Sequence, residues 1–232
     1  MTPLLRYVPR HLADHLLTRG AAMLVIGVVM LLPFLLAPTP EGGAPIEQIL
    51  RQGLHGVSPF LTLVATYGII DQDVRHGYYR FLLAKPISPV GYYAASFVVS
   101  LASFLVIMLL LIGFVAIARG PVWPGGHAVA DLTLEFLLLG ALVFAFSRFT
   151  RVDWVFGIAV LVTGSAVRTR WPPDESALGA VLNVAFPPDR PGSFFPRGTP
   201  DWPGISWTLG YAAVALTVGL LAVRFMPFGE RR

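Results

Sequence analysis

The chain has 232 residues, of which 55% are hydrophobic and only 13% are charged, and its formal net charge at pH 7 is +4. Its mean hydropathy of +0.69 is well above that of a soluble domain of this length, so the composition argues against a water-soluble fold. The absence of cysteine excludes disulfides, thiolate metal sites and thiol nucleophiles. No basic run with interleaved aromatic residues suggests nucleic acid, so we expect no nucleic acid partner.

The N-terminal segment, residues 1–19, predicts an amphipathic interfacial helix that lies along the membrane surface. Four of its apolar residues fall on one helical stripe, namely Leu5, Val8, Leu12 and Leu16. Pro9 fits best near the first turn, where its missing N–H costs little. A frayed tail is the alternative for this segment.

Six apolar runs follow, and each is a candidate membrane-spanning helix. A hydrocarbon core of roughly 30 Å requires about 20 mostly apolar residues in a helix. The runs cover residues 20–38, 57–71, 94–118, 129–147, 153–168 and 208–226, the second and the fifth being short. We therefore expect an all-α polytopic membrane protein with one domain, 1–232, in which five spans occupy 20–168 and a cytoplasmic tail occupies 227–232.

An outer loop is expected at 169–207, before the sixth span. Eight prolines lie between Arg168 and Trp207, and they bracket an apolar island at 177–186. The island is too short to cross a membrane, so it predicts a re-entrant or surface helix. A disordered loop is the alternative.

The distribution of basic residues predicts the orientation. With six spans, eleven of the 17 Lys and Arg residues fall in inner segments and six in outer ones. Cytoplasmic loops hold these residues preferentially, so both termini are expected in the cytoplasm.

The most informative stretch lies between the second and third predicted spans, at 68–96, and reads GIIDQDVRHGYYRFLLAKPISPVGYYAAS. An acidic residue is followed by a glycine, paired leucines, a proline and a hydrophobic residue next to serine. This pattern resembles the first cytoplasmic loop of type-2 ABC exporter permeases, although Tyr78 stands where that family more usually has threonine. The resemblance assigns an ATPase-coupling loop to Asp73, Arg75, Gly77, Tyr78, Arg80, Leu82, Leu83, Pro86 and Ile87.

The resemblance implies a permease subunit in the bacterial inner membrane that exports a substrate. The sequence has no glycine-rich loop ending in Gly-Lys-Ser or Gly-Lys-Thr, so ATP and Mg²⁺ would be bound by a separate cytoplasmic ATPase dimer. A second permease chain, identical or paralogous, and membrane lipids are the other expected partners. A non-transporting membrane anchor, assembly factor or regulatory subunit is the alternative, with the basic loop lying on lipid headgroups.

Glu135 is the clearest acid within a predicted span and is a possible substrate contact. It lies a turn or two inside the fourth span, and Asp131 lies one turn before it, so a wetted outer mouth with Arg119 as partner is the alternative. We expect no catalytic residue, because Ser165 has no histidine in a later span to act as its base. His11 and His15 share a helix face, but a solvated surface is favoured there over a metal site.

Overall fold

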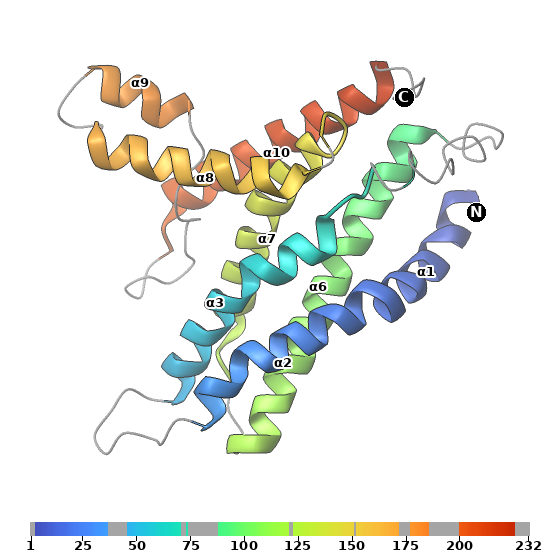
Figure 1. Ribbon diagram of the computed structural model, residues 1–232, viewed down its shortest axis with the longest axis vertical. Coiled ribbons are helices and arrows are strands. Elements are labelled where there is room, and N and C mark those ends of the chain that lie inside the picture. The colour runs from blue at the N-terminus through green and yellow to red at the C-terminus, as the bar shows by residue number, and fades with distance from the viewer. Residues whose placement is uncertain are drawn as a thin grey trace.

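The computed structural model describes residues 3–36, 46–70, 73, 88–120, 123–150, 152–171, 177–185 and 200–225, and this part of the chain is helical with no strand (Figure 1). The all-α class is confirmed. In chain order the helices are α1 (Pro3–His15), the π-helical turn η1 (Leu16–Gly20), α2 (Ala21–Leu36), α3 (Ile46–Thr66), α6 (Pro89–Arg119), α7 (Gly126–Phe146), α8 (Asp153–Arg170), α9 (Ala177–Ala185) and α10 (Trp202–Phe225).

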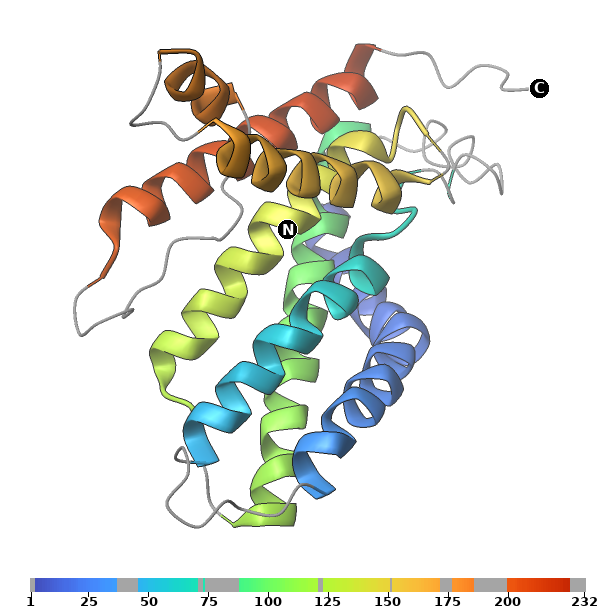
Figure 2. The same ribbon diagram turned by 60° about the vertical axis from the view of Figure 1, so that its left-hand side comes forward.

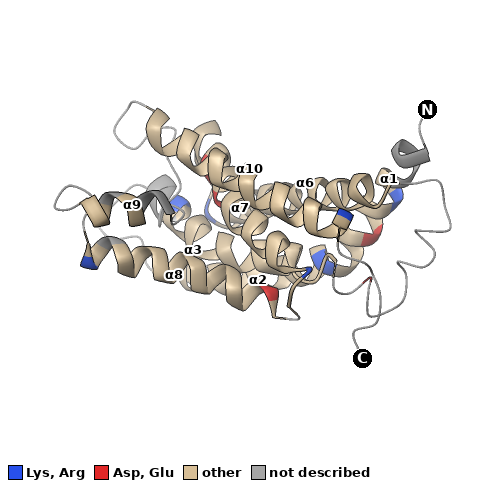
Figure 3. Cartoon of the chain, turned by 90° about the horizontal axis from the view of Figure 1, so that it is seen from above, with Lys and Arg blue, Asp and Glu red and all other residues tan. Residues whose placement is uncertain are grey.

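Four stretches of helix within the described residues are long and apolar enough to cross a membrane. They are Val8–Leu36, Pro89–Arg119, Gly126–Phe146 and Trp202–Phe225. These helices correspond to the first, third, fourth and sixth predicted spans. The other two predicted spans fall on α3, whose first half is polar, and on α8, whose apolar part is the shorter Asp153–Val167. Few positions along the helices carry a Lys, Arg, Asp or Glu residue, as the colours of Figure 3 show.

The N-terminal segment is helical as expected, but it begins earlier than Pro9 implied. α1 starts at Pro3, so Pro9 lies inside the helix and removes one intrahelical hydrogen bond there. The segment also continues without a break through η1 into α2. In Figures 1 and 2 this forms one long rod beside α6, against which both α1 and α2 pack.

The core of the bundle lies along α6 and α7, where aromatic rings interlock. The centroids of Phe104 and Phe136 are 4.9 Å apart, and Phe97 lies 5.6 to 5.7 Å from Phe136 and Phe144. α3 packs between α2, α6 and α7, while α10 packs mainly on α7. The polar groups discussed below are therefore held by well-packed helices.

The helix ends gather at two ends of the bundle. α2 and α6 terminate at the lower end of Figure 1, where α3 and α7 begin. α1 and α6 begin towards the upper end, where α3, α7 and α10 terminate. The turn between α7 and α8 also lies at the upper end. The start of α1 and the end of α10 thus lie at the same end of the bundle as the ends of α3 and α7.

α8 and α9 differ from the expected arrangement. α8 leaves α7 at a steep angle to α6 instead of running back along α7, and α9 packs on it in the upper part of both views (Figures 1 and 2). The apolar island at 177–186 does form a helix, α9, as predicted. However, it does not lie near the lower end, where the expected outer loop would be.

Candidate functional sites

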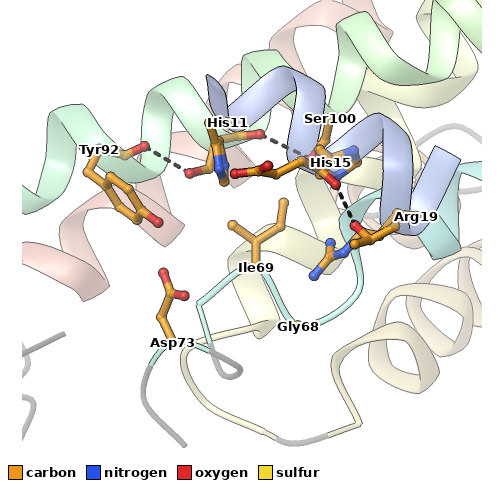
Figure 4. A pocket seen from close by; sticks show the side chains of 11 residues that line it. His11, His15, Arg19, Gly68, Ile69, Asp73, Tyr92 and Ser100 are labelled. Carbon is orange, nitrogen blue, oxygen red and sulfur yellow. Dashed lines mark hydrogen bonds between the residues drawn. The ribbon is translucent and has the colours of Figure 1, made fainter. Parts of the chain in front are cut away.

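A polar cavity of about 190 Å³ lies at the upper end, where α1, η1, the chain after α3 and the start of α6 meet (Figure 4). Its lining mixes basic, acidic and hydroxyl groups. Those used below are His11, His15, Arg19, Asp73, Tyr92 and Ser100.

His15 and Arg19 attach the first helix to the end of α3. The Nε2 atom of His15 lies 3.2 Å from both the Ala65 carbonyl oxygen and the Ser100 hydroxyl oxygen, and Arg19 donates to the same carbonyl at 2.9 Å. The last four carbonyls of a helix lack intrahelical donors, and cations are favoured at that end. The π-helical turn that carries Arg19 is therefore fixed to α3 and α6.

His11 and His15 were expected on a solvated face, and this was wrong for His15. Its side chain is buried, with 7% relative exposure, because α1 packs on α6 and places this face inside the protein. No group of three or more His, Cys, Asp or Glu residues gathers into a possible metal site in the described part of the chain.

Asp153 ties the turn between α7 and α8 to the chain after α3. Its buried carboxylate accepts hydrogen bonds from the Gly68 N–H at 3.0 Å and the Trp154 N–H at 2.9 Å. Close by, the Ser147 hydroxyl accepts from the Ile70 N–H at 3.1 Å. These contacts position the chain that leads into the predicted coupling loop.

Asp73, the first residue of the predicted coupling motif, belongs with Arg19 and Asp153 to a group of charged residues that we name the charge cluster. It lines the cavity, and both Asp73 and Asp153 act electrostatically on Arg19. At the other end of the loop, Ser88 caps α6 by accepting from the Gly91 N–H at 3.4 Å, which agrees with the predicted serine step into the third span. The remaining predicted coupling residues, namely Arg75, Gly77, Tyr78, Arg80, Leu82, Leu83, Pro86 and Ile87, lie outside the described residues.

A second polar site joins the parallel helices α3 and α7. Arg51 donates to Asp131 at 3.0 Å, and one turn further His55 Nδ1 is hydrogen-bonded to Glu135 Oε1. We name these four residues the α3–α7 ladder. Each helix has 21 residues, and His55 and Glu135 are each the tenth. Glu135 therefore lies at the middle of α7, deeper than the sequence suggested, because the helix begins at Gly126.

The sequence analysis identified the acids of the ladder but missed Arg51 and His55. Their spacing of four residues, equal to that of Asp131 and Glu135, was the available signal. Arg119, the partner in the alternative interpretation of these acids, donates to the Phe34 carbonyl at 3.4 Å and also to the Leu35 carbonyl. It thereby covers the C-terminal end of α2.

An apolar cavity of about 760 Å³ opens between α2, α3 and the start of α8. Phe60, Val64 and Trp154 line it, and Arg19 is the one charged residue among the described residues of the lining. Its volume is within the range of about 300 to 1,000 Å³ that is typical of ligand pockets.

Comparison of the chain with protein-family models, with curated proteins and with solved structures found no match. The described residues form a helical protein compatible with a membrane location, with the buried Asp153 at one end of the bundle and the partly buried His55–Glu135 pair at the middle of α3 and α7.

Proposed function

We propose that the chain is the permease subunit of an ABC exporter, driven by a separate cytoplasmic ATPase. The observation that carries the proposal is the position of Asp73. It is the first residue of the loop that resembles the coupling loop of type-2 permeases, and it lies in the charge cluster with Arg19 and Asp153.

The cluster offers a physical route from the loop to the helices. A movement of Asp73 changes its electrostatic interaction with Arg19, which is bonded to the end of α3. Arg19 also interacts electrostatically with Asp153, which is the first residue of α8 and accepts a hydrogen bond from the Gly68 N–H. Three helices would therefore respond to one loop, as a two-state transport cycle requires.

In this proposal α3 and α8 complete six spans, and two permease chains, identical or paralogous, pair around the substrate path. The apolar cavity beside α2, α3 and α8 supports a path for an amphipathic substrate, and Glu135 is the candidate substrate contact within the bundle. ATP and Mg²⁺ would be bound by the ATPase. Both termini would be in the cytoplasm, with α1 at the inner interface.

The test is affinity purification of the tagged full-length chain from its native membrane, followed by mass spectrometry. We expect an ABC ATPase to co-purify with the unchanged chain and to be lost from the Leu82→Asp, Leu83→Asp variant. The matched control is Leu178→Asp, Val181→Asp, which places the same charges on α9 at side chains that are 57% and 65% exposed. This control should retain the ATPase.

Two outcomes would reject the proposal. Absence of an ATPase from the unchanged sample would favour the anchor or regulatory role. Retention of the ATPase by the Leu82→Asp, Leu83→Asp variant, at equal amounts of chain in the membrane, would exclude this loop as the coupling element.

A further inference from the structure

We propose that the apolar cavity between α2, α3 and the start of α8 binds a neutral single-chain amphiphile from the surrounding membrane, of the monoacylglycerol class. The apolar cavity of about 760 Å³ and the polar cavity of about 190 Å³ share two lining residues, Thr18 and Arg19. An apolar space therefore adjoins a polar one at η1, which is the arrangement that an acyl chain with a polar head requires. Binding needs no ATPase, so this inference is independent of the permease proposal.

The lining of the apolar cavity is divided along its length. α2 runs towards the lower end of Figure 1 and α3 runs back towards the upper end. Ile26 lies seven residues after Arg19, and Phe60 lies seven residues before Tyr67. Seven helical residues span about 10 Å. The polar residues Thr18, Arg19 and Tyr67 therefore lie towards the upper end, and the apolar lining residues of α2 and α3 extend below them. These are Ala22, Ile26, Phe60, Leu63 and Val64.

The cavity is open to the side of the bundle. Phe60 and Trp154, which line it, are 52% and 40% exposed. α2 belongs to the stretch Val8–Leu36, which is long and apolar enough to cross a membrane. Apolar surface is stabilised by contact with hydrocarbon rather than water. An acyl chain can therefore enter this cavity laterally from the bilayer.

The charges around the polar cavity favour a neutral head over an ionic one. Among the described residues, the charged and titratable groups there are of both signs, namely Arg19, Arg148, Asp14, Asp73, Asp153, His11 and His15. Arg19 repels a cationic head, whereas the three aspartates repel an anionic one. An ionic head would also lose its hydration in entering the cavity. Hydroxyl groups both donate and accept hydrogen bonds, so a glycerol head can pair with groups of either sign and adds no net charge.

The test is photo-cross-linking of the full-length protein in phosphatidylcholine nanodiscs, with a monoacylglycerol that carries a diazirine in its acyl chain. Peptide mass spectrometry then locates the cross-links. We expect them on the lining residues of α2, α3 and the start of α8, and we expect excess unlabelled monoacylglycerol to suppress them. At pH 7 the fatty acid and the alkylamine of the same chain length should compete less well, because each brings a net charge to the site.

Two variants, each with a matched control, separate the chain-binding and head-binding parts of the site. Ala22→Phe should remove most of the saturable cross-linking because the ring fills the cavity, whereas Ala21→Phe, at an exposed position outside the described lining, should retain it. Thr18→Val should weaken binding about two- to tenfold, because one hydroxyl at the junction is lost. Thr217→Val is its control, since both threonines are exposed and donate to a carbonyl four residues earlier at 2.8 Å.

Three results would overturn the proposal. The first is cross-links in the unchanged protein that fall outside the lining or that excess unlabelled monoacylglycerol does not reduce, and this result needs no variant to accumulate. The second is stronger competition by the fatty acid or the alkylamine than by the monoacylglycerol. The third is equal cross-linking of Ala22→Phe and Ala21→Phe at equal amounts of chain in the nanodiscs. None of them bears on whether an ATPase co-purifies, so the two proposals can fail separately.

Discussion

Asp153→Ala should be one of the most destabilising single changes at the upper end of the bundle. The carboxylate is fully buried and accepts the Gly68 N–H at 3.0 Å. Its removal leaves that N–H without this acceptor and takes a negative charge away from Arg19. A hydrogen bond to a buried charged group contributes about 1.5 to 3 kcal/mol, and the Asp153 carboxylate accepts two, from Gly68 and Trp154. We expect a loss of about 3 to 5 kcal/mol in the free energy of unfolding.

The assay is reversible unfolding of the full-length protein in mixed micelles by titration with SDS, followed by circular dichroism. Asp153→Asn keeps an acceptor oxygen for Gly68 but loses the charge, so its cost should be smaller, about 2 kcal/mol. Asp201→Ala is the matched control, because this exposed carboxylate accepts one helical N–H, from Gly204 at 3.1 Å, and should cost about 1 kcal/mol. A cost for Asp153→Ala no larger than that of Asp201→Ala would refute the reasoning.

Two further predictions concern the packing of α7 and use the same unfolding assay. Gly219→Val should lower the free energy of unfolding by about 1 to 3 kcal/mol, because a Cβ there would lie 2.7 Å from the Phe144 ring. Gly210→Ala, with nothing within 4 Å of its Cβ, should leave the free energy of unfolding unchanged or raise it. Equal effects of the two substitutions would contradict this. In a double-mutant cycle, Arg51→Ala and Asp131→Ala should show a coupling energy of about 1 to 2 kcal/mol. This is less than for a fully buried pair, because Arg51 is partly exposed. Additive losses in the free energy of unfolding would contradict the ion pair.

Much of the fold could be predicted from the sequence because hydropathy and helix spacing are local properties. The apolar runs at 94–118 and 129–147 correspond to α6 and α7, and the island at 177–186 corresponds to α9. Ser88 was expected at the entry to the third span, and it caps α6. The six-span count was not established in the same way, since α3 is polar in its first half and α8 is short in its apolar part.

The candidate sites depended on which helices become neighbours. Glu135 was identified as an unusual acid from its place in an apolar run, which the sequence by itself determined. Its partner His55 lies 80 residues earlier, and Arg51 is equally far from Asp131. Helical periodicity places residues on one face, but it does not say which other helix that face will meet.

The sequence by itself determined that the chain is helical and apolar enough for a membrane, and it placed the loop after α3 at the centre of the functional hypothesis. Only the tertiary structure decided that His15 is buried, that Arg19 is bonded to the end of α3, and that α8 crosses the bundle at a steep angle. The physical reason is that the hydrophobic pattern of one helix can be recognised from its own sequence. A buried polar group is instead positioned by hydrogen-bond donors and acceptors on other helices.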